Sequence, residues 1–301
     1  DSVGGDGDGI TYRKNNGTIE LAALTSNLDG IVGWGVWSAI SGGTLLASGP
    51  IVDFDGETVE ITCSTEDIPR FIDQELAVGF TTSADFVYQI AAESNSWRGV
   101  CWSPELAIYC AVAISGTHQV MTSPDGETWT YHTAAEANQW SSVCWSPELE
   151  IFCAVAVSGT NRVMTSPNGI TWTAHPAAFG VETNSWRSVC WSSELEIFCA
   201  VSLDGTEHVM TSPNGADWNV QTDGTSNQWR GVCWSPELEL FCAVALDGTD
   251  RVMTSPDGVS WTPRTEAEAN QWFWICWSPE LSLFCAVATD GTHRVMTSPN
   301  G

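Results

Sequence analysis

The residues best able to bind a ligand recur in this sequence as a short polar and aromatic group. An Asn stands two positions before a Trp in five places, and an Arg follows that Trp in three of them. A Trp ring can stack on a sugar while Asn and Arg bind its hydroxyl groups. We therefore predict ligand-binding positions at Asn95, Trp97, Arg98, Asn138, Trp140, Asn184, Trp186, Arg187, Asn227, Trp229, Arg230, Asn270 and Trp272. The alternative is structural: the Asn fixes a turn, and the Trp links neighbouring repeats.

Cysteines form a second recurrent pattern, because two of them stand nine positions apart in every repeat. If a two-residue loop at Glu148 and Leu149 joins the strands, Cys144 lies directly across from Cys153, within disulfide reach. The same register places Trp145 across from Phe152. The disulfide candidates are Cys101, Cys110, Cys144, Cys153, Cys190, Cys199, Cys233, Cys242, Cys276 and Cys285. The alternative is that these cysteines are small buried apolar residues; Cys63 has no evident partner.

The residue types and spacings in this sequence do not match a catalytic or metal-binding site. No set of unrepeated residues matches an acid, a base and a nucleophile, so we predict no enzymatic activity and no cofactor. No His or third Cys recurs at zinc-ligand spacing, and we predict no metal site. Asp6 and Asp8 could bind calcium, but they lack a full ligand set, and a mobile acidic start is the alternative.

The repeats that carry these residues predict the fold. Their lead Trp residues stand at 97, 140, 186, 229 and 272, so the spacings are 43, 46, 43 and 43 residues. In the second repeat we expect strands at 140–146, 151–157 and 162–165, and a fourth from 171. The second strand is apolar throughout and must be covered on both faces. Four antiparallel strands per repeat are typical of a β-propeller blade, with an open solenoid as the alternative.

The fifth repeat runs only from Trp272 to Gly301, without a fourth strand. Residues near 85–90 match the fourth strand of another repeat, with Phe86 at the position of Trp129. We therefore predict a five-bladed all-β propeller over 81–301, whose last blade is closed by a strand from the N-terminal side. The alternative is that further blades follow downstream.

Residues 1–80 differ from the repeats and predict a small β-rich attachment module with a mobile Gly- and Asp-rich start. A hairpin about Asp55 and Gly56 is expected, because strand-like residues flank this turn signal. Trp34, Val36 and Leu45 indicate further strands.

The charge of the chain limits its partners. It carries 37 acidic against 10 basic residues, for a formal net charge of -27. Nucleic acids and anionic membranes bind Lys and Arg, so neither partner is expected. No apolar run approaches the length of a membrane span, and we predict no membrane insertion.

The segment Ser123-Pro124-Asp125-Gly126-Glu127-Thr128-Trp129 resembles the Asp-box turn of sialidase-like and other propellers, as do the segments at Ser166, Ser212 and Ser255. The longer repeat resembles propellers of bacteriophage tail and fibre proteins, and five blades with one site each resemble tachylectin-type lectins. These resemblances imply a non-enzymatic, extracellular or virion-associated structural protein that recognises a host surface glycan or protein. Residues 1–80 would then bind other virion or fibre proteins. The alternatives are a secreted multivalent lectin and a sialidase-like glycosidase, and a homo-oligomer stays open.

Overall fold

The structure, a computed structural model, describes residues 88–222 and 225–301 in full and residues 1–87 only at strands β1 to β7. Every regular element described is a β-strand. The chain divides into two compact units, Asp1–Tyr88 and Gln89–Gly301. The division lies eight residues beyond the boundary expected after residue 80.

The strands of the first unit form two antiparallel sheets. One has the order β1-β2-β3-β6 and the other β5-β4-β7. The strands are β1 (Val3–Gly5), β2 (Thr11–Asn15), β3 (Thr18–Leu21), β4 (Ile31–Ser38), β5 (Leu45–Pro50), β6 (Val59–Thr62) and β7 (Leu76–Thr82). The strands expected around Trp34, Val36 and Leu45 are confirmed. Residues 51–58, which include the turn and first strand of the hairpin expected about Asp55 and Gly56, lie outside the described residues, and the following strand β6 pairs with β3.

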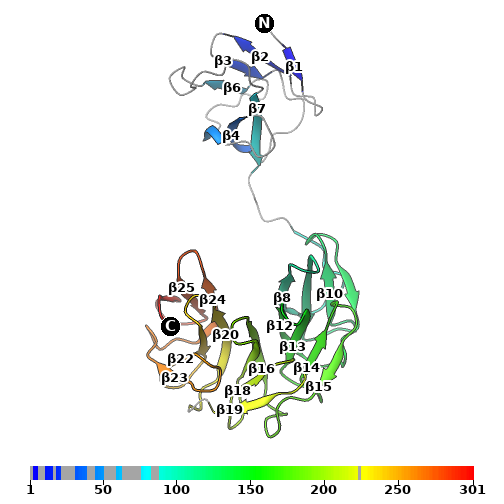
Figure 1. Cartoon of the computed structure of the whole chain (residues 1–301), viewed down its shortest axis with the longest axis vertical. Helices are drawn as coiled ribbons and strands as arrows, with labels where there is room; N and C mark the ends of the chain where they lie inside the picture. The colour runs from blue at the N-terminus through cyan, green and yellow to red at the C-terminus, as the bar shows by residue number, and fades with distance from the viewer. Residues whose placement is uncertain are drawn as a thin grey trace. The chain divides into compact units, whose positions relative to one another are not determined.

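The second unit is built from five successive antiparallel sheets, which we number as blades one to five (Figure 1). The first strands are β8 (Trp97–Ser103), β12 (Trp140–Ser146), β16 (Trp186–Ser192), β20 (Trp229–Ser235) and β24 (Trp272–Ser278). The second strands are β9 (Ile108–Ala113), β13 (Ile151–Ala156), β17 (Ile197–Ser202), β21 (Leu240–Ala245) and β25 (Leu283–Ala288). The third strands are β10 (Val120–Ser123), β14 (Val163–Ser166), β18 (Val209–Ser212), β22 (Val252–Ser255) and β26 (Val295–Ser298). The fourth strands of blades one to four are β11 (Thr130–His132), β15 (Thr173–His175), β19 (Asn219–Gln221) and β23 (Thr262–Arg264). The predicted all-β, propeller-like fold is confirmed.

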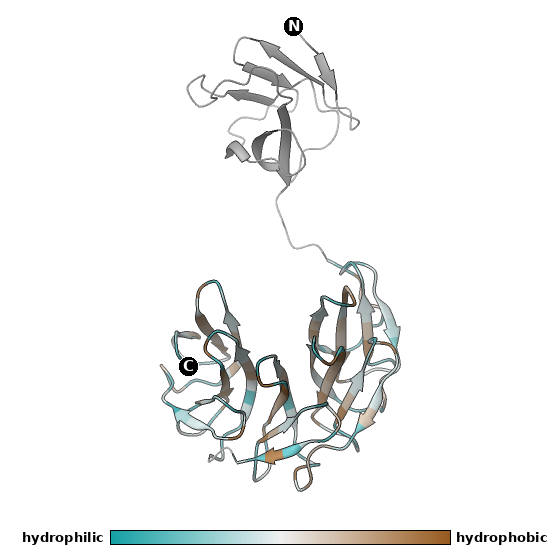
Figure 2. Cartoon of the chain, viewed as in Figure 1, coloured by the Kyte–Doolittle hydropathy of each residue, from teal (hydrophilic) through white to brown (hydrophobic). Residues whose placement is uncertain are grey.

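The register within each blade follows the sequence pattern. Cys144 lies directly across from Cys153 and Trp145 across from Phe152, as predicted. The Trp145 and Phe152 ring centroids lie 4.6 Å apart in a tilted arrangement, which favours an aromatic pair. Residues 152–156 are all buried, because blades pack against both faces of this apolar strand. The inner strands of the second unit are its most apolar part, whereas its loops are more polar, as Figure 2 shows.

A side-chain brace holds each Ser-Pro-Asp/Asn-Gly turn. In the first blade, Ser123 Oγ accepts a hydrogen bond from Gly126 N at 2.8 Å. Asp125 Oδ1 accepts bonds from Glu127 N at 2.9 Å and Thr128 N at 2.7 Å. Trp129 Nε1 then donates to Gly126 O at 3.0 Å. The turn that resembles an Asp-box therefore satisfies its backbone groups locally, in the manner of an Asx turn.

Successive blades pack through their first strands, which lie along the inner side of the arc in Figure 1. A repeated hydrogen bond joins these blades: in blades two to five, the Trp of the Cys-Trp-Ser segment donates to a Glu of the preceding blade. The donor and acceptor pairs are Trp145 to Glu105, Trp191 to Glu148, Trp234 to Glu194 and Trp277 to Glu237, at 2.5 to 2.6 Å. Apolar contacts and this bond together fix the angle between blades.

The fifth blade differs from the prediction. Its sheet has three strands, with the order β24-β25-β26. Of the expected closing segment 85–90, residues 85–87 lie outside the described part, and residues 88–90 form no strand. Tyr88 and Ile90 are fully or almost fully exposed, so neither side chain adds to a blade. The predicted closure is therefore not observed in the described residues.

Blades one and five lie at the two ends of the arc, and each leaves one face uncovered. Val100 of the first blade is 61% exposed, whereas Val143, at the same position of the second blade, is 6% exposed. In the fifth blade Val287 and Val295 are exposed, whereas their counterparts Val155 and Val163 are fully buried. The same apolar residues thus form the interface between two blades inside the arc and a bare face at its ends.

Candidate functional site

The five Asn residues predicted to bind a ligand all brace a turn of their own blade. Asn138 is 5% exposed, and its Nδ2 donates to Asn161 O at 2.5 Å. Its amide also fills the space beside Gly159, where any Cβ would overlap with it. Asn95, Asn184, Asn227 and Asn270 make the equivalent bond to the residue 22 or 23 positions later. These side chains therefore fix turns, as the structural alternative supposes.

The lead Trp residues pack inside the blades. Trp140, Trp186, Trp229 and Trp272 are fully buried, and Trp97 is partly buried. In three blades the indole Nε1 donates to the backbone carbonyl four residues earlier: Trp97 to Glu93, Trp140 to Glu136 and Trp272 to Glu268, at 3.0 to 3.1 Å. A ring with no exposed face cannot stack on a sugar, so the four buried rings are not ligand platforms in this conformation.

The residue after the lead Trp has a different position, which sequence reasoning missed. In every blade the pairing register shifts between the lead Trp and the residue two places later. Such a shift is a β-bulge, which leaves one residue outside the ladder and redirects its side chain. The bulged residues are Arg98, Ser141, Arg187, Arg230 and Phe273. Each blade therefore contributes one bulged residue on its innermost strand.

Four of these bulged residues form what we call the axial cluster: Arg98, Arg187, Arg230 and Phe273. The guanidinium carbon of Arg230 lies 4.0 Å from the centroid of the Phe273 ring of the next blade, a cation–π contact. Arg98 belongs to the first blade, yet its charge acts on both Arg187 and Arg230, two and three blades away. The curvature of the arc is what brings these distant repeats together.

Burial increases from one arginine of the cluster to the next. Arg98 is exposed, Arg187 is half-buried, and Arg230 is 8% exposed. Within the described residues, none of the three guanidinium groups makes a hydrogen bond or an ion pair, and Arg187 Nε is buried without a partner. Buried polar groups are normally paired, so this cluster is an exception that needs an explanation.

The arginines of the cluster act on one another electrostatically. Burial together with the neighbouring charges of Arg187 and Arg98 lowers the pKa of Arg230 to about 10. Burial and Arg98 also lower the pKa of Arg187, while Asp204 opposes them. Asp204 itself accepts hydrogen bonds from the backbone and hydroxyl of Ser185. Arg230 stays cationic at neutral pH, since its pKa remains well above 7.

The fifth bulged residue, Ser141, is used differently. Its Oγ donates to Trp186 O of the third blade at 2.7 Å, and Val155 O lies 3.1 Å away. Ser141 is 7% exposed and joins the second and third blades. It therefore belongs to the scaffold, and the positive charge comes from blades one, three and four.

The ten described cysteines are free thiols, and no disulfide joins them. The predicted facing arrangement is confirmed in all five blades, but the disulfide is not formed. Burial raises the pKa of the Cys144 thiol well above its usual range and that of Cys242 to about 12. A buried thiol with a raised pKa is a poor nucleophile, so these pairs act as small apolar residues in this structure.

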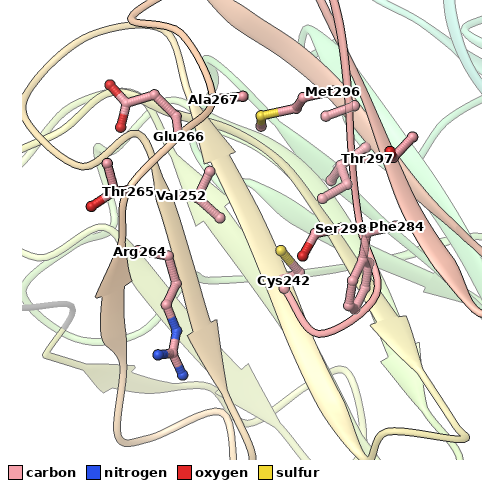
Figure 3. A pocket seen from close by; sticks show the side chains of 13 residues that line it. Cys242, Val252, Arg264, Thr265, Glu266, Ala267, Phe284, Met296, Thr297 and Ser298 are labelled. Carbon is pink, nitrogen blue, oxygen red and sulfur yellow. The ribbon is translucent and has the colours of Figure 1, made fainter.

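A pocket lies between the fourth and fifth blades, and Figure 3 shows Cys242, Phe284 and Met296 around it. Between the first and second blades the equivalent residues, Cys110, Phe152 and Met164, pack with Trp172. The pocket is thus the space that an indole fills in another blade, and we do not regard it as a ligand site.

Among the described residues, no group of three His, Cys, Asp or Glu side chains is placed to hold a metal ion, and no helix is long and apolar enough to cross a membrane. Asp6, Asp8 and Cys63 lie outside the described residues.

Comparison with known proteins supports the fold. No family profile and no curated protein matches the chain. A gluconolactonase from Xanthomonas campestris has a TM-score of 0.54 at 11% identity, over 69% of this chain and 74% of its own. YCF48 from Cyanidioschyzon merolae has a TM-score of 0.50 at 14% identity, over 65% of each chain. Nidogen, solved in complex with laminin, has a TM-score of 0.49 at 9% identity, over 87% of this chain and 96% of its own.

These similarities bear on architecture only. The chain spans 65% of the length of the YCF48 structure, and identities this low carry no function from one protein to another. The resemblance to phage fibre and tachylectin-type propellers is not among these findings. The chain is therefore similar to β-propeller proteins, and this similarity extends to its fold alone.

Proposed function

We propose that this protein is a non-enzymatic recognition protein whose propeller binds a partner on a host surface. The main observation in support of this proposal is the row of β-bulges on the innermost strands. In the repeats the Asn, Trp and Cys positions stay the same and hold the scaffold together, whereas the bulged position changes between Arg, Ser and Phe. Residues that vary on a constant scaffold are well suited to recognition.

The proposal extends to a virion-associated protein, such as a phage tail fibre or surface decoration, with the first unit bound to other virion proteins. Two features support it: the resemblance of the repeats to phage propellers, and the net charge of -27, which keeps a displayed protein soluble and away from nucleic acid. The partner would be a glycan or a protein of the host surface. This placement puts the protein outside the cell.

The multivalent lectin is the weaker alternative, because it needs a site in every blade. Asn138 and Trp140 are buried in scaffold contacts, as are the Asn–Trp pairs of the next three blades. The bulged residues instead form one shared cluster. The geometry therefore favours a single site per chain over one site per repeat, and multivalency would require assembly of several chains.

The experiment is a binding screen of the full 301-residue chain on a glycan panel and on intact candidate host cells. We expect saturable binding to one class of surface, with no turnover of the bound molecule. Binding to none of these surfaces would contradict the recognition role. Time-dependent release of a product would contradict the non-enzymatic assignment.

A further inference from the structure

We propose that the axial cluster is a single anion-binding site, in which Arg98, Arg187 and Arg230 bind a carboxylate or phosphate group of the ligand. This inference rests on the proposed recognition function and names the chemistry of its ligand. The prediction of one sugar site per blade treated each Asn, Trp and Arg as a unit. The structure separates the arginines from the Asn and Trp residues and joins them across blades.

The first argument is the unusual placement of positive charge. Only 10 of the 301 residues are Lys or Arg, against 37 Asp and Glu. Three of those ten occupy the same bulged position and lie close enough to perturb one another. Like charges brought together destabilise a fold unless an opposite charge compensates them. An acidic protein that nevertheless brings three of its nine arginines together at one place has a local need for an anion.

The second argument is that no hydrogen bond or ion pair from a described residue satisfies these guanidinium groups. Arg230 is more than nine-tenths buried, and Phe273 covers its guanidinium at 4.0 Å. Arg187 Nε is buried and unpaired within the described residues. A cation removed from water without a counter-charge is costly. A bound oxyanion would supply that charge and accept several hydrogen bonds at once, since guanidinium groups bind carboxylates and phosphates in bidentate geometry.

The third argument is access. Arg98 is exposed, so an anion can reach the cluster from solvent through this residue and then contact the more buried arginines. The Phe273 ring lies against one face of the Arg230 guanidinium. A ligand can therefore contact that group only along the edge that the ring does not cover. The cluster therefore fits a small charged group on a larger ligand. Because the three arginines come from three different blades, we expect one ligand per chain.

The test uses calorimetric titration of the full chain with citrate, inorganic phosphate, and the matched pair glucuronate and glucose. The two sugars differ in a carboxylate, so the pair isolates the anion. We expect citrate and glucuronate to bind with a stoichiometry of one, glucose not to bind, and the affinity to fall as salt rises. The relative affinities of citrate and phosphate identify the preferred oxyanion.

The decisive variant is Arg98→Gln, with Arg294→Gln as its control. Both arginines are exposed and stand at repeated positions, and both changes remove one positive charge, but Arg294 is not part of the cluster. Arg98→Gln should weaken citrate binding about tenfold or more, since charged hydrogen bonds are lost. Arg294→Gln should leave citrate binding unchanged. Because Arg98 is exposed, its loss should not unfold the chain, and a thermal melt verifies this.

Several outcomes would overturn the proposal. These are the absence of citrate and phosphate binding, equal binding of glucose and glucuronate, several anions per chain, and equal losses in the two variants. The outcomes also separate this site from the proposed function. If Arg98→Gln leaves surface binding intact, the anion site is refuted and the recognition role is kept. If anions bind but no surface does, the anion site is kept and the recognition role is refuted.

Discussion

A substitution of Gly159 by Ala tests whether the buried Asn braces each turn. Gly159 has a φ of +119°, and a Cβ there would overlap with the Asn138 amide. Two costs follow: backbone strain of about 1–3 kcal/mol, and displacement of Asn138 from its bond to Asn161 O. Leaving that buried amide unpaired costs about 1–3 kcal/mol. We therefore expect Gly159→Ala to lower the free energy of unfolding by about 2–6 kcal/mol.

Gly180 provides the matched control. Its φ is +92°, but nothing lies within 4 Å of a Cβ placed there. Gly180→Ala should thus cost only the backbone strain, about 1–3 kcal/mol. Chemical denaturation followed by Trp fluorescence measures both variants. The signal reports mainly on the second unit, because only Trp34 and Trp37 of the 17 Trp residues precede residue 88.

A double variant separates the overlap from the strain. Asn138→Ala alone should lose the stabilisation from the hydrogen bond to Asn161 O. Combined with Gly159→Ala, it also removes the overlap between the new Cβ and the Asn138 amide. The double variant should therefore be about 1–3 kcal/mol more stable than the sum of the two single changes predicts. Additive costs, or equal costs at Gly159 and Gly180, would refute the idea that the Asn is a turn brace.

Three further predictions concern the hydrogen bonds and thiols. Glu194→Ala should destabilise the chain by about 1 kcal/mol in a thermal melt, because Trp234 donates to Glu194 across blades. The same change at Glu280 should be neutral, since no indole donates to that carboxylate in the described residues, and equal effects would contradict the inter-blade role. Backbone hydrogen bonds lower the pKa of Asp125 to about 2, so its stabilising contribution is present above pH 4 and is lost as the pH falls through about 2. Asp125→Asn keeps the accepting oxygen and should reduce the loss of stability over that range in acid titrations; an unchanged acid profile would contradict this. Of the described thiols, iodoacetamide should modify that of Cys276 first, because it is exposed. Intact mass should show that the buried thiols react only after unfolding. If they react only after unfolding and reduction together, the cysteines form disulfides.

Much of the blade could be predicted from sequence because its signals are local. The strand expected at 140–146 is present at those residues, and the pairing of Cys144 with Cys153 follows from the turn between them. Pairing between strands that lie far apart in the sequence is not a local signal. In the first sheet β6 pairs with β3, and Ile61 lies opposite Ile19. Reasoning from a single sequence does not identify such a distant partner, because strand preferences depend on the neighbouring strands.

The site was harder to predict than the fold. Asn138 and Trp140 have the residue types of a ligand site, and only burial shows that they belong to the scaffold. The arginines were identified, but their grouping was not. A bulge has no clear sequence signal, because it adds one residue to a strand without changing the apolar pattern beyond it. The proximity of Arg98 to Arg230 depends on the curvature of several blades, which no single repeat encodes.

The bulges also bear on how this protein could acquire new specificity. In a regular strand, inserting one residue turns every following side chain to the opposite face. Here each blade holds its extra residue outside the ladder, so Arg98 or Phe273 can be exchanged without moving the pairs on either side. Stability and recognition are therefore encoded by different positions of the same strand. A library randomised at Arg98 and Phe273 should retain folded members, which makes the second unit a suitable starting scaffold for directed evolution.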